Sequence, residues 1–404
     1  MTLEPQRFAA LVLADAALTA RLAAFDDGAA FVAEVVRIAR AHDVALPEAC
    51  TQPTHAGLAS LCQWIGPPLV RSSLPPPEWF PSGVADDSGA VDIDWARFGP
   101  QRLHALFDDN DARRAVHLPF NRVFRYRTGL QDLIVRAETA DCLKPSGLIF
   151  HMSRCGSTLA AQMLAALSDS IVFSELEPID AIVRLGRRLP EAHAVRALRA
   201  IVTAFGRNRG GRERRFFVKL DCWHTLALPL FRRAFPDVPW VFLYRDPAEV
   251  LVSQMRQRGM QMVPQFLPPG FYGIDWAERI NDEDYCARVL GVICRAAIDH
   301  HGSGGGLVLN YRQLPQGIWT TVLRHFGILC SEEERLGMQR AAQRDAKSPT
   351  VPFVGDTEAK QRAANANVRR AAERHVGAIY HRLEALSANL APDGKPALSG
   401  VRRA

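Results

Sequence analysis

The stretch Gly147-Leu-Ile-Phe-His-Met-Ser-Arg-Cys-Gly-Ser-Thr-Leu-Ala160 decides the fold of this chain. Its first four residues predict a short apolar strand, a loop containing Gly156 follows, and a helix is expected to begin at Ser157 and Thr158. This order directs several backbone N–H groups to one point, where the helix N-terminus adds partial positive charge. The stretch predicts a site for a phosphate-like anion, although serine and threonine are also common caps of an ordinary helix.

The loop differs from the Walker A motif of ATP-binding proteins. That motif is GxxxxGK[ST] and places a lysine directly before the hydroxyl residue. Here Gly156 directly precedes Ser157, and the nearby cation is Arg154, two residues before the glycine. The sequence therefore disfavours an ordinary ATP site and its usual magnesium chemistry.

Outward from this loop, apolar strands alternate with helices. Strands are expected at 147–150, 171–173, 216–220, 240–244 and 306–310, and helices at 159–167, 228–235, 247–258, 316–326 and 367–386. Such alternation predicts an α/β fold, with a parallel sheet covered by helices on both faces. We assign this domain to residues 146–404.

Two further regions precede the α/β domain. Apolar residues recur at helical spacing in residues 1–48, and Asp26-Asp27-Gly28 interrupts them, which predicts a helical hairpin. Residues 49–145 combine proline clusters with many aromatic side chains. We expect this region to be packed around those aromatic rings and not to be a free linker or a base-stacking platform.

Composition excludes several classes of protein. The 404 residues carry 49 Lys+Arg against 43 Asp+Glu, and 48% of them are hydrophobic, which is ordinary globular composition. The eight cysteines contain no CxxC pair, so a structural zinc site is not indicated. No apolar run has the length of a membrane span, and no leader segment is evident, so we expect a cytoplasmic protein that binds neither membrane nor nucleic acid.

A second motif lies at 241–253, in Val-Phe-Leu-Tyr-Arg-Asp-Pro-Ala-Glu-Val-Leu-Val-Ser. A strand ends before Arg245, and Ser253 follows eight residues later on the next helix. Together with the loop 153–158, this motif resembles the PAPS-dependent sulfotransferases, over about residues 146–360. PAPS is 3′-phosphoadenylyl sulfate, and its product after sulfuryl transfer is PAP.

The resemblance implies a P-loop-like parallel sheet and PAPS as co-substrate, without a metal. It implies that the loop residues hold the 5′-phosphosulfate, and that Arg245 and Ser253 hold the 3′-phosphate. The loop residues concerned are Arg154, Cys155, Gly156, Ser157 and Thr158. A planar guanidinium suits a phosphate because it can donate two parallel hydrogen bonds.

Three residues are implied as catalytic. Arg154 stands where the family usually has a loop lysine, and it would neutralise the leaving phosphate, although it is a poor proton donor. Lys219 ends a predicted strand and would face the sulfuryl group. Glu175 follows another strand, where several branches of the family place a glutamate that acts as the base.

The sequence leaves several candidates for the base. Glu177 lies two residues after Glu175, on the same face of an extended segment, so periodicity does not separate them. Another branch of the family has Lys-x-His at the strand end, where this chain has Lys219-Leu-Asp221. That departure favours a carboxylate base, and it leaves Asp221 and His224 as alternatives.

The remaining expectations concern the nucleotide lid, the acceptor and other functions. Lys347 and Lys360 are candidates for a basic C-terminal segment that closes over the nucleotide. The apolar, proline-rich segment 261–272 is expected to shape the pocket of a small-molecule or peptide acceptor.

The alternative functions are a P-loop-type nucleotide kinase and a non-catalytic nucleotide- or peptide-binding protein. The second alternative arises because residues 4–48 faintly resemble the helical leader domains of ribosomally made peptides.

Overall fold

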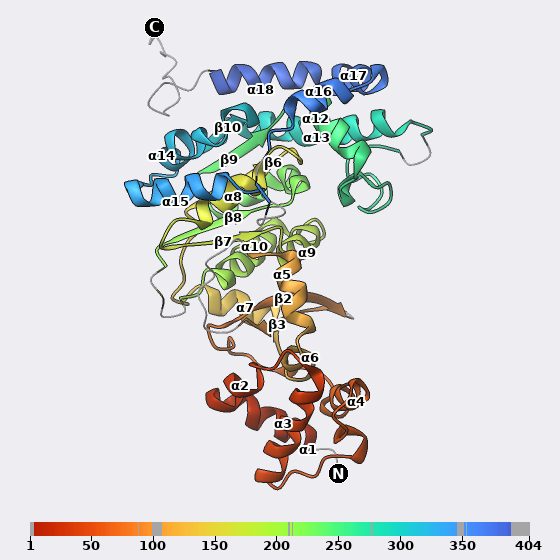
Figure 1. Ribbon diagram of the computed structural model, residues 1–404, viewed down its shortest axis with the longest axis vertical. Helices are drawn as coiled ribbons and strands as arrows, with labels where there is room; N and C mark the ends of the chain where they lie inside the picture. Colours follow the sequence, from red (N-terminus) through yellow and green to blue (C-terminus); the bar gives the residue numbers. More distant parts are fainter. Residues whose placement is uncertain are drawn as a thin grey trace. The chain divides into compact units, whose positions relative to one another are not determined.

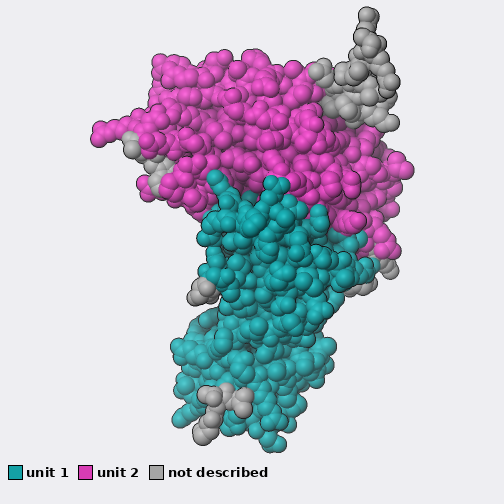
Figure 2. Space-filling view, turned by 180° about the vertical axis from the view of Figure 1, so that it is seen from behind, with its two compact units in different colours: residues 1–102, 107–143, 176–211 teal, residues 103–106, 144–175, 212–404 magenta. Residues whose placement is uncertain are grey.

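We describe a computed structural model of the chain. The structure describes residues 4–87, 89–98, 107–208, 211, 213–275, 278–345, 351–352 and 354–388. The chain divides into two units, which Figure 2 shows in separate colours: unit 1 holds 1–102, 107–143 and 176–211, and unit 2 holds 103–106, 144–175 and 212–404. The residues 176–211, which were predicted to belong to the α/β domain, therefore group with the N-terminal unit.

The described residues 4–41 contain three helices, whereas the sequence predicted a hairpin of two. They are α1 (Glu4–Ala14), α2 (Ala16–Leu22) and α3 (Gly28–Ala41). Asp15 separates α1 from α2: its backbone is extended, and its side chain caps α2 by accepting hydrogen bonds from the N–H groups of Ala17 and Leu18, at 2.8 and 3.0 Å. Asp27 caps α3 in the same manner. A side-chain oxygen at this position replaces a missing helical acceptor, so one aspartate divides an otherwise continuous apolar pattern.

The rest of unit 1 is built around a small sheet with the strand order β1-β5-β3-β2. Its strands are β1 (Leu69–Val70), β2 (Trp79–Asp87), β3 (Ala90–Arg97) and β5 (Tyr126–Gly129). Its further elements are α4 (His55–Ile65), β4 (Phe107–Asp108), α5 (Asp109–His117), α6 (Pro119–Val123), α7 (Leu130–Ala137), α9 (Glu177–Gly186) and α10 (Glu191–Phe205). Trp79, Trp95, Phe120 and Phe124 are fully buried. The prediction that these aromatic residues form a packed core is confirmed.

Unit 2 contains the predicted parallel sheet (Figure 1). Its strands run in the order β10-β9-β6-β8-β7, and each neighbouring pair is parallel. They are β6 (Gly147–His151), β7 (Ser170–Ser174), β8 (Arg215–Lys219), β9 (Trp240–Tyr244) and β10 (Gly306–Asn310). Every residue of β6, β7 and β9 is buried, as expected for strands covered on both faces. The predicted α/β fold class is confirmed, with each predicted strand shifted by at most one residue.

Helices cover this sheet. They are α8 (Ser157–Ala165), α11 (Leu228–Ala234), α12 (Pro247–Arg256), α13 (Asp282–His301), α14 (Leu323–His325), α15 (Glu332–Ala342), α16 (Thr357–Ala363), α17 (Ala366–Ala372) and α18 (Ala378–Ala388). Short 3-10 or π turns occur at η2 (Cys222–Ala227), η3 (Met260–Met262), η4 (Tyr311–Gln313), η5 (Ile318–Val322) and η6 (Glu373–Gly377). α15 packs against α8, and α13 packs against α11, α12, α17 and α18. The sequence pattern did not predict α13, the longest of these helices.

Within the described part of the chain, none of the helices combines the length and the hydrophobicity that crossing a bilayer requires.

Candidate active site

The carboxyl ends of the strands bring the predicted residues to one edge of the sheet in unit 2. β6 ends at His151 and continues into the loop, and β7 is followed by Glu175. β8 ends at Lys219, and β9 is followed by Arg245. Because β6 lies between β8 and β9, the chain leaves it where the strand order changes direction. Open parallel sheets bind their ligands at such points.

The loop between β6 and α8 has a backbone suited to an anion. Ser153, Arg154 and Gly156 all have positive φ, at 79°, 52° and 83°. A backbone that enters and leaves the left-handed region turns its N–H groups to one side and forms a concave nest. Gly156 is the N-cap of α8 and offers no side-chain acceptor to the first turn. The first N–H groups of α8, from Ser157 onward, have no helical acceptor and can bind a ligand oxygen.

Gly156 is required at this position for two reasons. Its φ is unfavourable for any residue with a Cβ, and a Cβ placed there would lie 2.7 Å from Leu314 Cδ1 and 2.8 Å from Tyr311 Cδ2. We expect Gly156→Ala to lower the free energy of unfolding by about 2–4 kcal/mol, combining left-handed strain with overpacking.

Chemical denaturation measures this effect, and Gly327→Ala is its matched control. Gly327 has φ of 68°, and a Cβ placed there would meet no described atom within 4 Å. This control carries the backbone strain alone, so its loss is expected to be about 1–2 kcal/mol. Equal losses in the two variants would contradict the steric part of the argument.

His151 holds the loop against the other strand ends, and it was not among the site residues predicted from sequence. Its Nδ1 accepts a hydrogen bond from the Ser153 N–H at 3.0 Å. Its Nε2 lies 2.9 Å from the Leu220 carbonyl and 3.2 Å from Glu175 Oε1. Because a carbonyl only accepts, Nε2 carries the proton and the ring is neutral. Burial, together with the charge of Lys219, lowers the pKa of His151 from its ordinary value, which keeps this neutral form.

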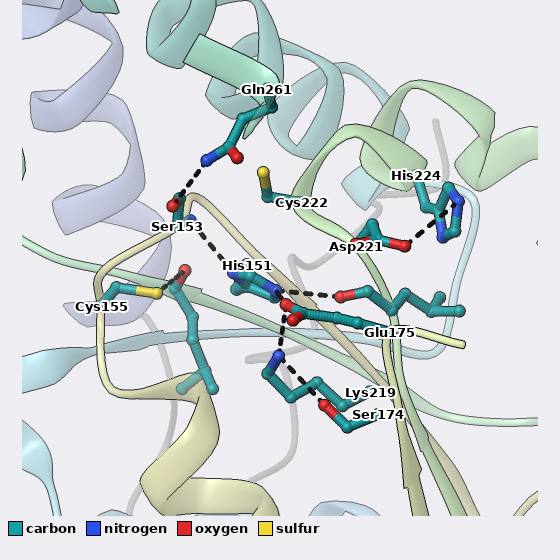
Figure 3. A network of polar contacts seen from close by, with 12 residues as sticks. His151, Ser153, Cys155, Ser174, Glu175, Lys219, Asp221, Cys222, His224 and Gln261 are labelled. Atoms are coloured by element: carbon teal, nitrogen blue, oxygen red, sulfur yellow. Dashed lines mark hydrogen bonds and ion pairs between the residues drawn. The ribbon is translucent and has the colours of Figure 1, made fainter. Parts of the chain in front are cut away.

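Two glutamines fix the side chain of Ser153. Gln254 of α12 donates to Ser153 Oγ at 3.1 Å, and Gln261 of η3 donates to the same oxygen at 2.9 Å. Figure 3 shows Gln261 pointing to Ser153 above the His151 ring. Gln254 also accepts from the N–H of Gly259 at 2.8 Å. The loop 152–156, called the anion loop from here on, is thus hydrogen-bonded to the segment that follows α12.

Glu175 and Lys219 form an ion pair beside the loop (Figure 3). Lys219 Nζ lies 2.5 Å from Glu175 Oε1 and 3.3 Å from Ser174 Oγ. The lysine is 2% exposed, whereas the Glu175 side chain is 39% exposed, so the carboxylate can be reached from solvent. Glu175 has φ of 53°, outside the strand conformation that precedes it.

The charge of Glu175 is set by these neighbours. Desolvation alone would raise the pKa of Glu175, but the Lys219 ammonium and the His151 ring hold it below its ordinary value. The carboxylate is therefore ionised at neutral pH. It is available as a proton acceptor, although its strong pairing makes it a weaker base than an unpaired glutamate.

Arg154 and Cys155 point in different directions from the loop. One guanidinium nitrogen of Arg154 donates to the Gln257 carbonyl at 2.8 Å. Burial lowers the pKa of Arg154, but arginine starts so high that it stays charged. The Cys155 thiol donates to the Leu243 carbonyl at 3.1 Å, and burial raises its pKa to about 12. A thiol with that pKa is not a nucleophile at neutral pH, so its side chain anchors the loop to β9.

The Arg245 guanidinium contacts two carboxylates and an aromatic ring. It donates to Glu249 at 2.6 Å and to Asp356 at 2.6 Å, and its guanidinium carbon lies 3.9 Å from the centroid of the Tyr311 ring. Ser253 lies on α12 and is half-buried. Of the two lysines expected near the nucleotide, Lys347 lies outside the described residues, and Lys360 is buried on α16 with its Nζ 2.7 Å from Asp356 Oδ2.

The other candidates for the base are placed less favourably. Glu177 is the first residue of α9, is exposed and belongs to unit 1. Asp221 and His224 lie at the start of η2, with His224 Nε2 3.9 Å from Asp221 Oδ2, and His224 is only 1% exposed. Of the four, Glu175 combines contact with Lys219 and access from solvent, so it stays our prediction for the base.

Searches against protein-family models and curated proteins found no match to this chain. Solved structures similar to it include the sulfotransferase domain from the curacin biosynthetic pathway, with 16% identity, a TM-score of 0.39, and coverage of 58% of this chain and 98% of that domain. The sulfotransferase domain from the olefin synthase of Synechococcus PCC 7002 has 15% identity, a TM-score of 0.35, and coverage of 58% and 96%.

A sulfotransferase from Mycobacterium tuberculosis H37Rv is also similar, with 16% identity, a TM-score of 0.33, and coverage of 52% of this chain and 75% of that protein. At these TM-scores the likenesses carry no conclusion about this chain, and its chemistry is inferred from the residues of the site alone.

Proposed function

We propose that this chain transfers a sulfuryl group from PAPS to a hydroxyl or amine acceptor and releases PAP. The observation that carries the proposal is the anion loop at the start of α8, with the Lys219–Glu175 pair at the same sheet edge and His151 hydrogen-bonded to both. One site thus offers donors for an anion, a fixed cation and an accessible carboxylate. This set of groups matches the needs of in-line sulfuryl transfer, which resembles phosphoryl transfer in its charge distribution.

The residues of the loop fit an anionic donor. The N–H groups of the nest and of the first turn of α8 are suited to the oxygens of a phosphosulfate. We assign Arg154 and Lys219 as the positive charges that act on the phosphosulfate, so the proposal invokes no metal. Arg245, directly after β9, and Ser253, on α12, are the residues we assign to the 3′-phosphate.

In the proposed reaction, the acceptor oxygen or nitrogen attacks the sulfur of PAPS and forms the new bond to sulfur. The bond from sulfur to the bridging oxygen of the 5′-phosphate breaks, and its electron pair leaves with PAP. Glu175 takes the proton that the acceptor loses. Lys219 and Arg154 stabilise the negative charge that develops on the sulfuryl oxygens and on the leaving phosphate.

The segment after α12 is the proposed acceptor site. A small hollow in this segment, with room for little more than a water molecule, is lined mainly by apolar and aromatic side chains, among them Val263, Leu267, Pro268, Phe271 and Ile274. Gln261 lines the same hollow and donates to Ser153 in the anion loop. We therefore propose an acceptor with an apolar or aromatic surface beside its hydroxyl or amine.

A comparison of PAP, AMP and ATP tests the proposed function. Selective thermal stabilisation by PAP supports sulfuryl transfer, because PAP alone of the three carries a 3′-phosphate. Equal or greater stabilisation by ATP with magnesium would favour the nucleotide kinase instead. Formation of a sulfated product from PAPS and a phenol or amine acceptor, followed by mass spectrometry, would exclude a non-catalytic binding protein.

Arg245→Ala is expected to weaken PAP binding by roughly 10- to 100-fold, since a hydrogen bond to a charged group contributes about 1.5–3 kcal/mol. AMP binding should change much less, because AMP lacks the phosphate that Arg245 is proposed to hold. Isothermal titration calorimetry gives both affinities. The ratio of the two is the decisive quantity, because the loss of the Glu249 partner also affects stability. Equal weakening of both ligands would remove Arg245 from the 3′-phosphate site.

A further inference from the structure

One carboxylate contacts both Arg245, which the proposed function assigns to the 3′-phosphate, and Lys360, which the sequence suggested for a segment that closes over the nucleotide. Arg245 donates to Asp356 Oδ1 at 2.6 Å, and Lys360 Nζ lies 2.7 Å from Asp356 Oδ2. Each oxygen of one carboxylate is therefore held by a different cation. Thr357 Oγ1 lies 3.3 Å from the same guanidinium nitrogen. The Asp356 carboxylate therefore has the contacts that a bound anion would make with these two cations.

The two acidic partners of Arg245 differ in their surroundings. Glu249 is 4% exposed, and its second oxygen accepts from Gln361 at 2.9 Å, so it is fixed within the packed interior. The Asp356 side chain is 44% exposed, although the Arg245 and Lys360 side chains that it contacts are only 4% and 7% exposed. Asp356 is thus the partner that can exchange with solvent and with a ligand.

Among the described residues, the Asp356 side chain shows no structural role besides its contacts with these cations. It stands at the N-cap position of α16, but its side chain makes no capping hydrogen bond. Although burial acts to raise it, the pKa of Asp356 is lowered by Lys360 and Arg245, so the group is an anion at neutral pH. Its oxygens therefore offer the two cations the same kind of contact as the oxygens of a phosphate monoester.

We propose that Asp356 is an internal competitor for the 3′-phosphate, which holds Arg245 and Lys360 in the ligand-free chain and is displaced when the nucleotide binds. The inference rests on the proposed function, since it takes PAP or PAPS as the displacing ligand. It makes Asp356 a residue that sets nucleotide affinity and the preference for a 3′-phosphorylated nucleotide. A dianionic phosphate monoester can replace the carboxylate because it brings more charge and more acceptor oxygens to the same two cations.

Asp356→Asn tests the competition directly. The amide keeps the shape of the side chain but removes its charge, so PAP should bind about 10-fold more tightly, which is the scale of two partly exposed ion pairs. AMP has no 3′-phosphate and does not compete with Asp356 for the two cations, so its affinity should stay within about 2-fold of the wild-type value. Isothermal titration calorimetry with PAP and AMP measures both, without reference to turnover. Asp356→Ser is a second variant with the same expectation, and it keeps the test available if the amide disturbs the packing.

Glu358→Gln is the matched control, because this substitution also removes one negative charge, two residues further along the chain. The Glu358 side chain is 90% exposed and lies 4.0 Å from Arg362, so it does not hold Arg245 or Lys360. The PAP affinity of this variant should match that of the wild type. If the wild type prefers PAP over AMP but Asp356→Asn and Asp356→Ser bind PAP equally or more weakly, Asp356 positions Arg245 and the inference is wrong. If the wild type shows no preference for PAP, the proposed function fails together with the inference.

Discussion

Glu175→Gln is expected to lower turnover by about 10²–10⁴-fold, the usual contribution of a positioned general base. PAP affinity should stay nearly unchanged, because the carboxylate is proposed to contact the acceptor and not the nucleotide. Glutamine keeps the shape of the side chain and can still accept from Lys219, so the loss reports proton transfer. Steady-state kinetics with PAPS and a phenol acceptor, alongside calorimetry with PAP, separates the two effects.

Glu177→Gln is the control for this prediction. Glu177 has the same chemistry two residues away, but it is exposed at the first turn of α9, so its loss should affect turnover much less. Thermal unfolding of each variant corrects for the fraction folded, because Glu175→Gln leaves the buried Lys219 without its counter-charge. Lowered stability with nearly normal turnover per folded molecule would make Glu175 structural. Full activity would instead transfer the role to Glu177, Asp221 or His224.

The sheet and its loop were predictable from sequence because their signals are local. β9 is a continuous apolar run between Pro239 and Arg245, and its predicted bounds are those of the structure. A strand buried on both faces has no polar positions to obscure it. Gly156 followed by two hydroxyl residues likewise marks the start of α8 within a few residues.

The parts that escaped prediction depend on contacts that are distant in sequence or on weak patterns. His151 is one polar residue at the end of an apolar strand, and its importance follows only from Ser153, Leu220 and Glu175 meeting around it. α13 is buried along much of its length and has mixed polarity, so its amphipathic stripe is weak, although Asn281 and the three acidic residues after it form a clear helix start.

The contacts of Arg245 show the same limit of prediction from sequence. Glu249 is predictable as a partner, since it lies four residues later, in the first turn of the helix that follows Arg245. Asp356 reaches Arg245 across 111 residues of chain, and no periodicity connects the two. A charged side chain near the C-terminal end of the described chain reads in sequence as solvated, and only the tertiary structure shows which cations it meets.

Lys219→Met is expected to reduce turnover by about 10²–10³-fold, the scale on which one preorganised donor stabilises developing charge. Methionine is similar in length and apolar, so it fills the space of a side chain that is 2% exposed without leaving a cavity. Lys144→Met, at an exposed lysine of the same unit, is the control for the loss of one positive charge, and it should retain normal turnover.

The pH profile of the Lys219→Met variant distinguishes an electrostatic role from a packing role. In the wild type the pKa of Glu175 lies below its ordinary value, so the carboxylate is ionised above about pH 4.5 and is lost as base only as the pH falls through its lowered pKa. Without the ammonium, burial acts on Glu175 with less opposition and its pKa rises. The acidic limb of kcat/KM should therefore move upward, toward neutral pH, in Lys219→Met and stay in place in Lys144→Met. A uniform loss of activity at every pH, with the limb unmoved, would mean that Lys219 contributes packing or charge to the site without setting the state of Glu175.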